Sequence, residues 1–295
     1  MSAVSVHALT KSYGPLKAVN GIDLEIAVGE VVAILGPNGA GKTTTVEMIE
    51  GFRRPDSGTI SVLGHDPSDR PAELLDRIGI VLQEGGIEED LTVREAIEAQ
   101  RRPYAEPMSA DEAIETVDLV EKADERIKGL SGGQRRRLDL ALGIVGNPDL
   151  LFLDEPTTGF DPAARRRSWE AIRQLASSGT TVVLTTHYLE EAQQLADRVV
   201  VMSMGEIVAN GSPDDLGERR SGLSTIRFRI DPSRAGALGV EPDAGGWVVT
   251  ETHDPIRLIN ELTGKALATG IAIEDFEVGK ITLEEAYLRL VTHDG

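Results

Sequence analysis

Alternating and continuous apolar positions predict two kinds of strand in the first two-thirds of the chain. Ile22, Leu24 and Ile26 alternate with polar residues, the pattern of a half-solvated antiparallel strand. Residues 58–64 form a short strand between turn residues, which we assign to the same peripheral sheet. Three other segments are apolar almost throughout, as in strands that are buried on both faces: 31–35, 150–153 and 181–185.

Helical periodicity occupies the segments between the buried strands. Residues 90–129 are predicted to be helical, and the pairs Thr92 with Glu95 and Ser109 with Glu112 match the capping box of helix starts. Further helices are expected after residue 41, after residue 131 and at about 163–177. Strands that alternate with helices predict an α/β fold with a mostly parallel sheet covered by helices.

A break in composition marks the end of this pattern, at the turn residues 211–213 and 217–222. Beyond it, strands and helices are expected at about 224–230, 247–250, 254–268, 271–278 and from 282 onward. We therefore predict a larger α/β domain at 1–218, with a helical subdomain at about 84–145, and a small α+β domain at 219–295.

Composition and charge exclude several classes of protein. Lys and Arg number 30 against 49 Asp and Glu in 295 residues, and the net charge of −19 argues against a protein that coats nucleic acid. Without cysteine there is no disulfide, thiolate nucleophile or Cys-bound zinc, and the five histidines are not spaced as metal ligands. The longest strictly apolar run, 31–35, is far shorter than the about 20 residues of a membrane-spanning helix. Residues 1–10 lack signal-peptide features, so we expect a cytoplasmic protein.

A glycine-rich segment with the pattern G-x-x-x-x-G-K-[ST] lies between a predicted buried strand and a predicted helix. It runs from Gly36 to Thr43 as Gly-Pro-Asn-Gly-Ala-Gly-Lys-Thr. Its glycines allow successive backbone N–H groups to point at phosphate oxygens. Lys42 supplies a positive charge for the β and γ phosphates, and Thr43 offers a hydroxyl to Mg²⁺. The segment therefore predicts a nucleotide-phosphate site.

The predicted strand at 150–153 leads into an acidic pair, Asp154 and Glu155. At the carboxyl edge of the sheet Asp154 can hold Mg²⁺ through water, and Glu155 can polarise an attacking water as general base. An acidic pair after a strand is by itself more often only the start of a loop. The phosphate pattern upstream favours the catalytic interpretation.

Leu130 to Gln134 form a second glycine-rich helix start. Ser131 and Gln134 match the capping box, which explains these two residues but leaves the pair Gly132 and Gly133 unexplained. A glycine pair at a helix start allows an anion to approach the backbone closely. The chain thus has two predicted phosphate-binding helix starts, about 90 residues apart.

Leu130–Gln134, between the phosphate cradle and the acidic pair, resembles the signature motif of ATP-binding cassette ATPases. Tyr13 is similar to the aromatic residue that stacks on adenine in this family, and Gln83 to the glutamine that contacts Mg²⁺ and senses the partner subunit. His187 resembles the switch histidine that contacts the γ-phosphate. The landmarks occur in the family's order over roughly residues 4–216.

One further landmark departs from the family pattern. Gly159, Phe160 and Asp161 resemble the loop that crosses the dimer interface, although leucine is usual at the position of Phe160. Asp161 before Pro162 also matches a helix N-cap followed by proline at the first helical position. Capping and interface roles are therefore both open for Asp161.

The resemblance implies a RecA-like P-loop NTPase core with an antiparallel β subdomain and a helical signature subdomain, followed by the C-terminal α+β domain. It implies ATP and Mg²⁺ as ligands, with Glu155 as base and His187 stabilising charge. The metal is expected at Thr43, Gln83 and Asp154. The residues expected at the nucleotide are Tyr13, Gly36, Asn38, Gly39, Ala40, Gly41, Lys42, Thr43, Thr44, Gln83, Ser131, Gly132, Gly133, Gln134 and Asp161.

The resemblance also implies partners. In this family two cassettes pack head to tail, so we expect a second copy or a paralogous subunit. A membrane permease would dock on the segment from Gln83 to about residue 129, although a solvated face is the commoner explanation for the acidic residues there. The arginine runs 135–137 and 165–167 are predicted to be solvated helix faces or intersubunit ion pairs, with no nucleic acid bound.

The tail is similar to the C-terminal region of bacterial export ATPases of the daunorubicin-resistance and sodium-export type, in the segment 281–290. It implies a peripheral exporter subunit whose cargo is a drug, antibiotic, lipid or ion. A soluble cassette ATPase that acts on ribosomes or DNA is the alternative, and a P-loop small-molecule kinase leaves Leu130–Gln134 and His187 unexplained. For the tail itself, a dimer-stabilising module is favoured over a regulatory ligand site.

Overall fold

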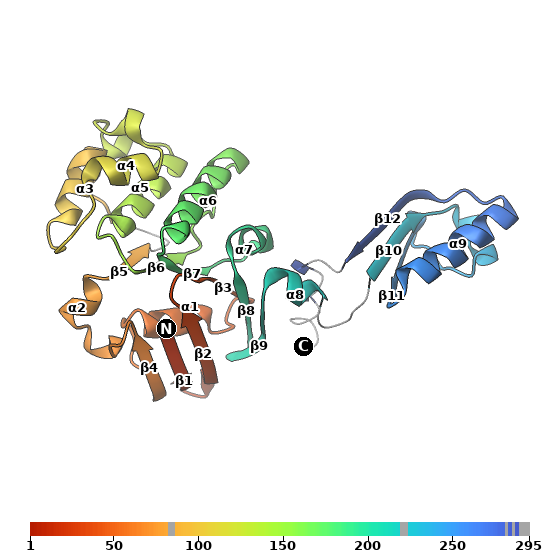
Figure 1. Cartoon of the computed structure of the whole chain (residues 1–295), viewed down its shortest axis with the longest axis horizontal. Coiled ribbons are helices and arrows are strands. Elements are labelled where there is room, and N and C mark those ends of the chain that lie inside the picture. Colours follow the sequence, from red (N-terminus) through yellow and green to blue (C-terminus); the bar gives the residue numbers. More distant parts are fainter. Residues whose placement is uncertain (82–85, 219–223, 281–282, 285–286, 289–295) are drawn as a thin grey trace. The chain divides into compact units, whose positions relative to one another are not determined.

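The computed structural model describes residues 1–81, 86–218, 224–280, 283–284 and 287–288. The chain forms two compact units, Met1–Ser212 and Pro213–Gly295, each with its own sheets and helices (Figure 1). The functional bounds 1–218 and 219–295 stay a prediction. Within the described part of the chain, every helix is too short or too polar to cross a bilayer.

A mixed sheet forms the centre of the first unit. Its strands are β3 (Val31–Leu35), β5 (Ile78–Val81), β6 (Leu150–Asp154), β7 (Thr181–Thr185), β8 (Arg198–Ser203) and β9 (Glu206–Gly211). Among the described residues the order is β5-β6-β7-β3-β8-β9, and the pairs are parallel except at the edge strand β9. β3 and β7 are buried along their whole length, which confirms the predicted buried strands. β8 and β9 have no counterpart among the predicted elements.

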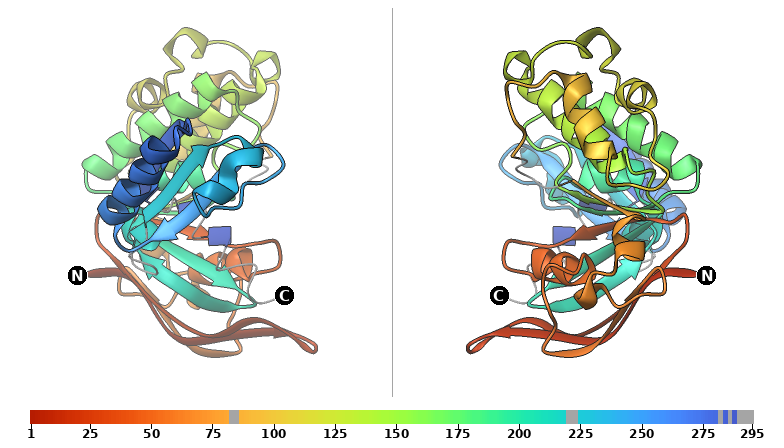
Figure 2. Two further views of the ribbon diagram at one scale, coloured as in Figure 1. Left: turned by 90° about the vertical axis from the view of Figure 1, so that its right-hand side faces the viewer. Right: turned by 90° about the vertical axis from the view of Figure 1, so that its left-hand side faces the viewer.

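Helices lie on both sides of this sheet. The longer ones are α1 (Lys42–Ile49), α3 (Val93–Arg101), α5 (Gly132–Ile144) and α6 (Pro162–Ser177), and the shorter ones are α2 (Ala72–Leu75), α4 (Ala110–Thr116) and α7 (Leu189–Leu195). In Figure 1, α3 to α6 lie above the sheet and α1 lies below it. Figure 2 shows the same separation from two sides, with α3 to α5 and the N-terminal strands at opposite ends of the unit. The predicted α/β class is confirmed.

The predicted helical segment 90–129 is correct in its helix starts and wrong in its continuity. Capping boxes are present at Thr92, before α3, and at Ser109, before α4. Between these helices Pro103 and Pro107 interrupt the chain, because proline has no backbone N–H for the helical hydrogen bond. The segment also contains 3₁₀ turns at 120–122 and 127–129.

A second sheet covers the other side of α1. It is antiparallel, with strands β1 (Ser2–Tyr13), β2 (Leu16–Ala27) and β4 (Ser57–Val62) in the order β2-β1-β4 within the described residues. Ile22, Leu24 and Ile26 of β2 are buried, which confirms the predicted alternation. One hydrophobic core includes residues of both sheets and of α1. Because α1 is anchored in this core, the glycine-rich loop at its start is held in place.

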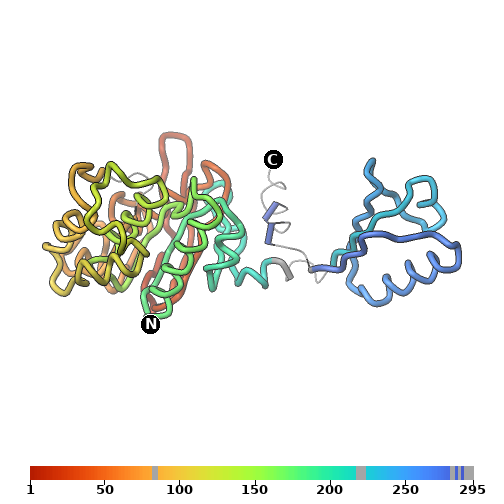
Figure 3. The backbone as a smooth tube through the Cα atoms, turned by 90° about the horizontal axis from the view of Figure 1, so that it is seen from above, coloured from red at the N-terminus to blue at the C-terminus, as the bar shows by residue number. Residues whose placement is uncertain are grey.

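The second unit is a small α+β domain, as predicted. Its elements are α8 (Pro213–Glu218), β10 (Ser224–Arg229), β11 (Trp247–Thr252), α9 (Pro255–Thr269) and β12 (Glu274–Lys280). Within the described residues the strands form an antiparallel sheet in the order β11-β10-β12, and α9 runs along one face of it (Figure 3). Ile226, Phe228, Val248 and Leu262 belong to its core. Of the predicted last helix, Leu283, Glu284 and residues 287–288 are described and are helical, and the rest lies outside the described residues.

Candidate functional site

The glycine-rich loop joins β3 to α1 and packs closely on neighbouring backbone. Gly41, the N-cap of α1, has a φ of 98°, in the region that favours glycine. A Cβ on Gly41 would lie 2.2 Å from the carbonyl oxygen of Ala18, and one on Gly36 would lie 2.4 Å from that of Met202. Side chains are excluded at both positions, so the loop can turn its N–H groups toward one bound anion.

Lys42 reaches back across this loop. Its Nζ donates to the carbonyl oxygens of Gly36 at 2.8 Å and Pro37 at 3.0 Å. Burial lowers the pKa of the Lys42 ammonium, while the negative charges of Glu155 and Asp154 oppose that shift. The ammonium group therefore lies in the loop and faces the acidic pair, as a phosphate-binding lysine requires. Thr43 and Thr44 follow in the first turn of α1.

The acidic pair lies at the carboxyl edge of the central sheet. Asp154 ends β6 directly beside Thr185, the last residue of the parallel strand β7. The Thr185 hydroxyl donates to Asp154 Oδ1, which orients this carboxylate. The strand order thus brings Asp154 to the same edge as the loop that follows β3.

Glu155 occupies a left-handed backbone conformation, with a φ of 46°. Its N–H donates to the carbonyl oxygen of Thr185 at 3.0 Å. Its carboxylate is 3.1 Å from His187 Nδ1 through Oε1 and accepts from the Thr158 hydroxyl at 3.1 Å through Oε2. The Glu155 and His187 side chains are 24% and 49% exposed, so both can meet solvent and a bound phosphate. This geometry fits a general base beside a charge-stabilising histidine.

The second glycine-rich start has the predicted capping box. Gln134 N–H donates to the Ser131 hydroxyl at 3.3 Å, and Ser131 N–H donates to Gln134 Oε1 at 2.8 Å. Among the described residues, a Cβ on Gly132 would meet nothing within 4 Å, and one on Gly133 would meet only the Ala164 Cβ at 3.5 Å. Packing within the chain therefore does not require this glycine pair, which leaves the N-terminus of α5 open to a ligand.

Three other predicted residues have different surroundings. Tyr13 is 41% exposed at the end of β1, and the Arg53 guanidinium lies 5.4 Å from its ring centroid. Asp161 Oδ1 accepts from the N–H groups of Ala163 and Ala164, both at 2.9 Å, and these bonds lower the pKa of its carboxyl. The capping role of Asp161 is therefore present. Gln83 lies outside the described residues.

The prediction for the arginine runs is wrong for two of their members. Arg136 donates to the carbonyl oxygen of Asp154 at 2.7 Å. Arg137 is 8% exposed and donates to the side chain of Asp118 at 2.9 Å and to the carbonyl oxygen of Val117 at 3.2 Å. Both guanidinium groups therefore bind within the chain, because α5 packs against the segments that supply these oxygens.

Thr185, Thr158 and Arg136 contact the acidic pair and are absent from the predicted site. Thr185 had a signal in the sequence, since it ends a strand at the edge where Asp154 was expected. Thr158 lies three residues after Glu155, in the loop that the acidic pair begins. Arg136 had no such signal, because its contact depends on how α5 packs against β6.

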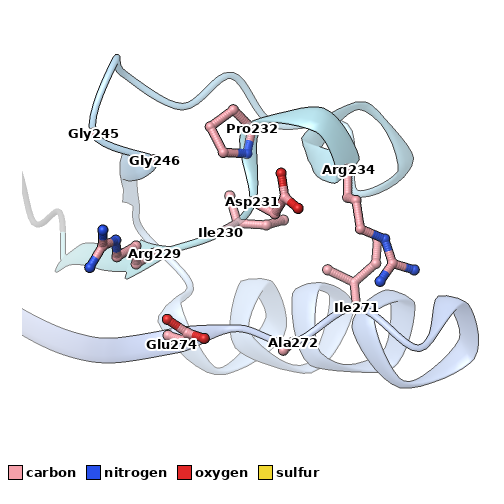
Figure 4. A pocket seen from close by; sticks show the side chains of 10 residues that line it. All are labelled: Arg229, Ile230, Asp231, Pro232, Arg234, Gly245, Gly246, Ile271, Ala272 and Glu274. Atoms are coloured by element: carbon pink, nitrogen blue, oxygen red, sulfur yellow. The ribbon is translucent and has the colours of Figure 1, made fainter.

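A separate cavity of about 460 Å³ lies in the C-terminal unit (Figure 4). It is lined by the oppositely charged side chains of Arg229, Arg234, Asp231 and Glu274. Arg234 also donates to the carbonyl oxygens of Gly270 and Thr269, both at 3.3 Å, at the end of α9. Because these charges offset one another, the cavity does not resemble the phosphate cradle.

Comparison with known proteins gives concordant results. The family described as ABC transporter matches residues 19–158. The daunorubicin/doxorubicin resistance ATP-binding protein DrrA of Streptomyces peucetius is 38% identical over 311 aligned positions, which cover 99% of this chain and 93% of that protein. The Nod factor export ATP-binding protein I of Burkholderia orbicola is 41% identical over 239 positions, 79% of each chain.

Solved structures share the fold of the larger part of the chain. A structure of the ATP-binding subunit of an ABC transporter has a TM-score of 0.66 at 26% identity, covering 75% of this chain and 93% of that one. The dimeric structure of a post-hydrolysis state of the cassette MJ0796, bound to ADP and Pi, has a TM-score of 0.63 at 27% identity, covering 71% and 98%. With the ordered motifs, the fold and a relative that matches almost the full length, the chain belongs to the ATP-hydrolysing, ATP-binding subunits of ABC transporters.

Proposed function

We propose that the Gly36–Thr43 loop binds the phosphates of ATP and that Glu155 acts as the general base of hydrolysis. The observation that carries this proposal is the meeting of Lys42, Asp154, Glu155 and His187 at one edge of the central sheet. Lys42 binds the phosphate oxygens, Glu155 accepts a proton from the attacking water, and His187 stabilises the charge on the transferred phosphoryl group. Tyr13 stacks on the adenine ring.

The residues at this edge also fit Mg²⁺. Thr43 and Asp154 offer a hydroxyl and a carboxylate, and Gln83 is proposed as a further contact. In nucleotide sites Mg²⁺ takes few protein ligands beside water and phosphate oxygens, so no cluster of three acidic or histidine side chains is needed; none occurs within the described ranges. When bound, the ion neutralises charge on the β and γ phosphates.

A second cassette, either another copy or a paralogous subunit, would complete the site. The solved dimer of a related cassette supports this proposal, as does the N-terminus of α5, whose glycine pair is not explained by contacts within the chain. Ser131, Gly132, Gly133 and Gln134 would contact the ATP held by the other subunit. Asp161 caps α6 and would lie at the same interface.

We further propose that the chain powers a separate membrane permease on the cytoplasmic face of the membrane and serves export. Similarity over 99% of the chain to a protein whose name states daunorubicin and doxorubicin resistance supports this assignment, and a Nod factor export protein supports the direction. A drug-like molecule is the proposed cargo, with lipid or ion as the alternatives. The net charge of −19 weighs against a cassette that acts on ribosomes or DNA.

Hydrolysis by the Glu155→Gln variant tests the proposed base. The amide cannot accept the proton, so we expect turnover to fall by about 10²–10⁴ while ATP binding persists. Steady-state phosphate release and equilibrium binding of a fluorescent ATP analogue measure the two quantities. Wild-type turnover in this variant would overturn the role of Glu155.

Capture of partners tests the export assignment. Tagged Glu155→Gln protein, purified from its source cells with MgATP and detergent, should retain its ATP-bound complexes, which mass spectrometry identifies. Recovery of a protein with several membrane spans supports the permease, and a transport assay with that protein then tests the cargo. Recovery of ribosomal or DNA-bound proteins without a membrane subunit would favour the alternative.

A further inference from the structure

Arg136 connects the signature helix to the turn that carries Glu155. It lies one turn into α5, and its Nη2 donates to the carbonyl oxygens of Asp154 at 2.7 Å and of Glu155 at 3.3 Å. Its Nε donates to the carbonyl oxygen of Pro156 at 3.3 Å. One guanidinium group thus binds three successive backbone carbonyls, which its planar arrangement of donors allows.

The turn at Glu155 needs external support. Its φ of 46° lies in the left-handed region, which residues with a Cβ adopt rarely. The carbonyls that Arg136 binds belong to the residue itself and to its two neighbours, Asp154 and Pro156. These bonds therefore restrain the peptide planes on both sides of the strained residue.

This backbone conformation sets the direction of the carboxylate. With it, Glu155 Oε1 lies 3.1 Å from His187 Nδ1, and Oε2 accepts from Thr158. A change in the turn would move the carboxylate away from these partners and from the water that it must deprotonate. Small misplacements of a reacting group lower rates strongly without abolishing substrate binding.

The environment of Arg136 suits a structural donor of this kind. Its side chain is 11% exposed, so water competes little for the carbonyl oxygens. Burial lowers the pKa of the guanidinium, and Asp139, whose Oδ2 is 3.8 Å from Nη1, opposes that shift. Arginine remains charged under these conditions. The guanidinium group therefore remains a charged donor to these carbonyl oxygens.

We propose that Arg136 is a positioning residue that holds the left-handed turn at Glu155 and thereby aims the catalytic carboxylate. The inference rests on the proposed role of Glu155 and deepens it. Because Ser131 caps the N-terminus of α5, the Arg136 side chain also links the helix start proposed to meet the second subunit's ATP with the turn at Glu155 of its own subunit. A movement of this helix start on ATP binding would thus be transmitted to Glu155 through the Arg136 side chain.

The first test compares Arg136→Met and Arg136→Lys with Arg135→Met in the full-length protein. Arg135 is the neighbour on the same helix and makes a surface ion pair with Glu89 at 2.5 Å, at 37% exposure. We expect Arg136→Met to lower kcat by about 10- to 100-fold, with the affinity for MgATP within about threefold of wild type. The kcat of Arg136→Lys should lie between those of Arg136→Met and wild type, because an ammonium group lacks the planar set of donors of a guanidinium group. Arg135→Met should retain wild-type kcat.

A double variant separates positioning from general damage. If Arg136 acts through Glu155, adding Arg136→Met to Glu155→Gln should slow single-turnover hydrolysis by less than about twofold beyond Glu155→Gln alone, because their effects are not additive. Multiplied effects would overturn the inference. Circular dichroism checks folding, and if Arg136→Met does not fold, Arg136→Lys decides: reduced kcat with unchanged ATP affinity supports the proposal and wild-type kcat overturns it.

The outcomes also distinguish this inference from the proposed function. Hydrolysis at the wild-type rate by Glu155→Gln would contradict the role of Glu155 as general base. Arg136 would then have no catalytic carboxylate to position. Slow hydrolysis by Glu155→Gln together with full activity of Arg136→Met would leave the base in place and overturn the role of Arg136.

Discussion

Glu50, at the end of α1, is a buried carboxylate that the proposed mechanism does not use. It is 4% exposed. Burial raises the pKa of its carboxyl from 4.5 to about 8, and the negative charges of Asp154 and Glu47 add to this shift, which Arg70 opposes in part. The helix start binds phosphate in our proposal, while the helix end holds a group that is neutral at physiological pH.

The raised pKa of Glu50 predicts a pH-dependent stability. Between pH 4.5 and about 8 the unfolded chain loses this proton before the folded one, so the free energy of unfolding falls as the pH rises. Glu50→Gln stays neutral, and its stability relative to wild type should increase over this range by up to the order of 5 kcal/mol. Urea unfolding at pH 5, 6, 7 and 8 measures the difference, with the exposed Glu73→Gln as control. A difference that does not change with pH would contradict the prediction.

Replacement of Lys42 should weaken the binding of MgATP itself and not only slow its hydrolysis. Its ammonium lies among the loop carbonyls and faces the acidic pair. Lys42→Ala removes the proposed charged donor to phosphate, so the affinity for MgATP should fall by about 10- to 100-fold. Equilibrium binding of a fluorescent ATP analogue checks this, and the exposed Lys17→Ala should bind as wild type. Tight binding by Lys42→Ala would contradict the assignment of the loop.

At the scale of elements, α5 and β5 approach each other through two glycines. A Cβ on Gly79 of β5 would lie 2.1 Å from the carbonyl oxygen of Gly143 in α5, and one on Gly143 would lie 2.4 Å from the Val81 side chain. The sequence predicted a helix after residue 131, but the closeness of this contact depends on which strand lies beneath the helix. The same packing places Arg136 over the end of β6.

The contact predicts that Gly79→Ala destabilises the first unit. A methyl group at this position must push α5 away from β5, at a cost of about 1–3 kcal/mol in the free energy of unfolding. Chemical denaturation measures it. Gly86→Ala is the control, because a Cβ there meets nothing within 4 Å of the described atoms, and it should stay within about 0.5 kcal/mol of wild type. Equal stabilities of the two variants would argue against the close packing.

At the scale of the whole molecule, each unit has its own hydrophobic core. The sequence contains two tryptophans, and one lies in each unit, Trp169 in α6 and Trp247 in β11. Single-tryptophan variants can therefore report the unfolding of each unit separately. Trp247→Phe retains the probe of the first unit, and Trp169→Phe retains that of the second.

Separate cores predict two unfolding transitions in the full-length protein. A ligand stabilises the unit that binds it, so MgATP at 100 times its Kd should raise the free energy of unfolding of the first unit by about 2.7 kcal/mol. Only the urea midpoint reported by Trp169 should therefore rise. Fluorescence during urea denaturation, with and without MgATP, measures both midpoints. Coincident curves that shift equally with MgATP would show that the chain unfolds as one unit.

Much of the fold and the site could be predicted from the sequence because the signals are local. Residues close along the chain form the glycine-rich loop, the buried strands and the capping boxes at Thr92, Ser109 and Ser131. Prediction was weaker where local signals were diffuse: prolines divided the segment 90–129, and β8 and β9 were missed although Val199, Val200 and Val201 form an apolar run.

The sequence by itself determined the glycine-rich loop expected at phosphate, the helix starts with capping boxes and the buried strands β3, β6 and β7, since these follow from neighbours along the chain. Only the tertiary structure decided the strand order β5-β6-β7-β3-β8-β9, the pairing of Asp154 with Thr185 and the bonds of Arg136 to the turn at Glu155. These contacts join segments far apart in the sequence. An apolar pattern indicates that a helix face is buried, but only the packing of the elements decides which segment covers that face.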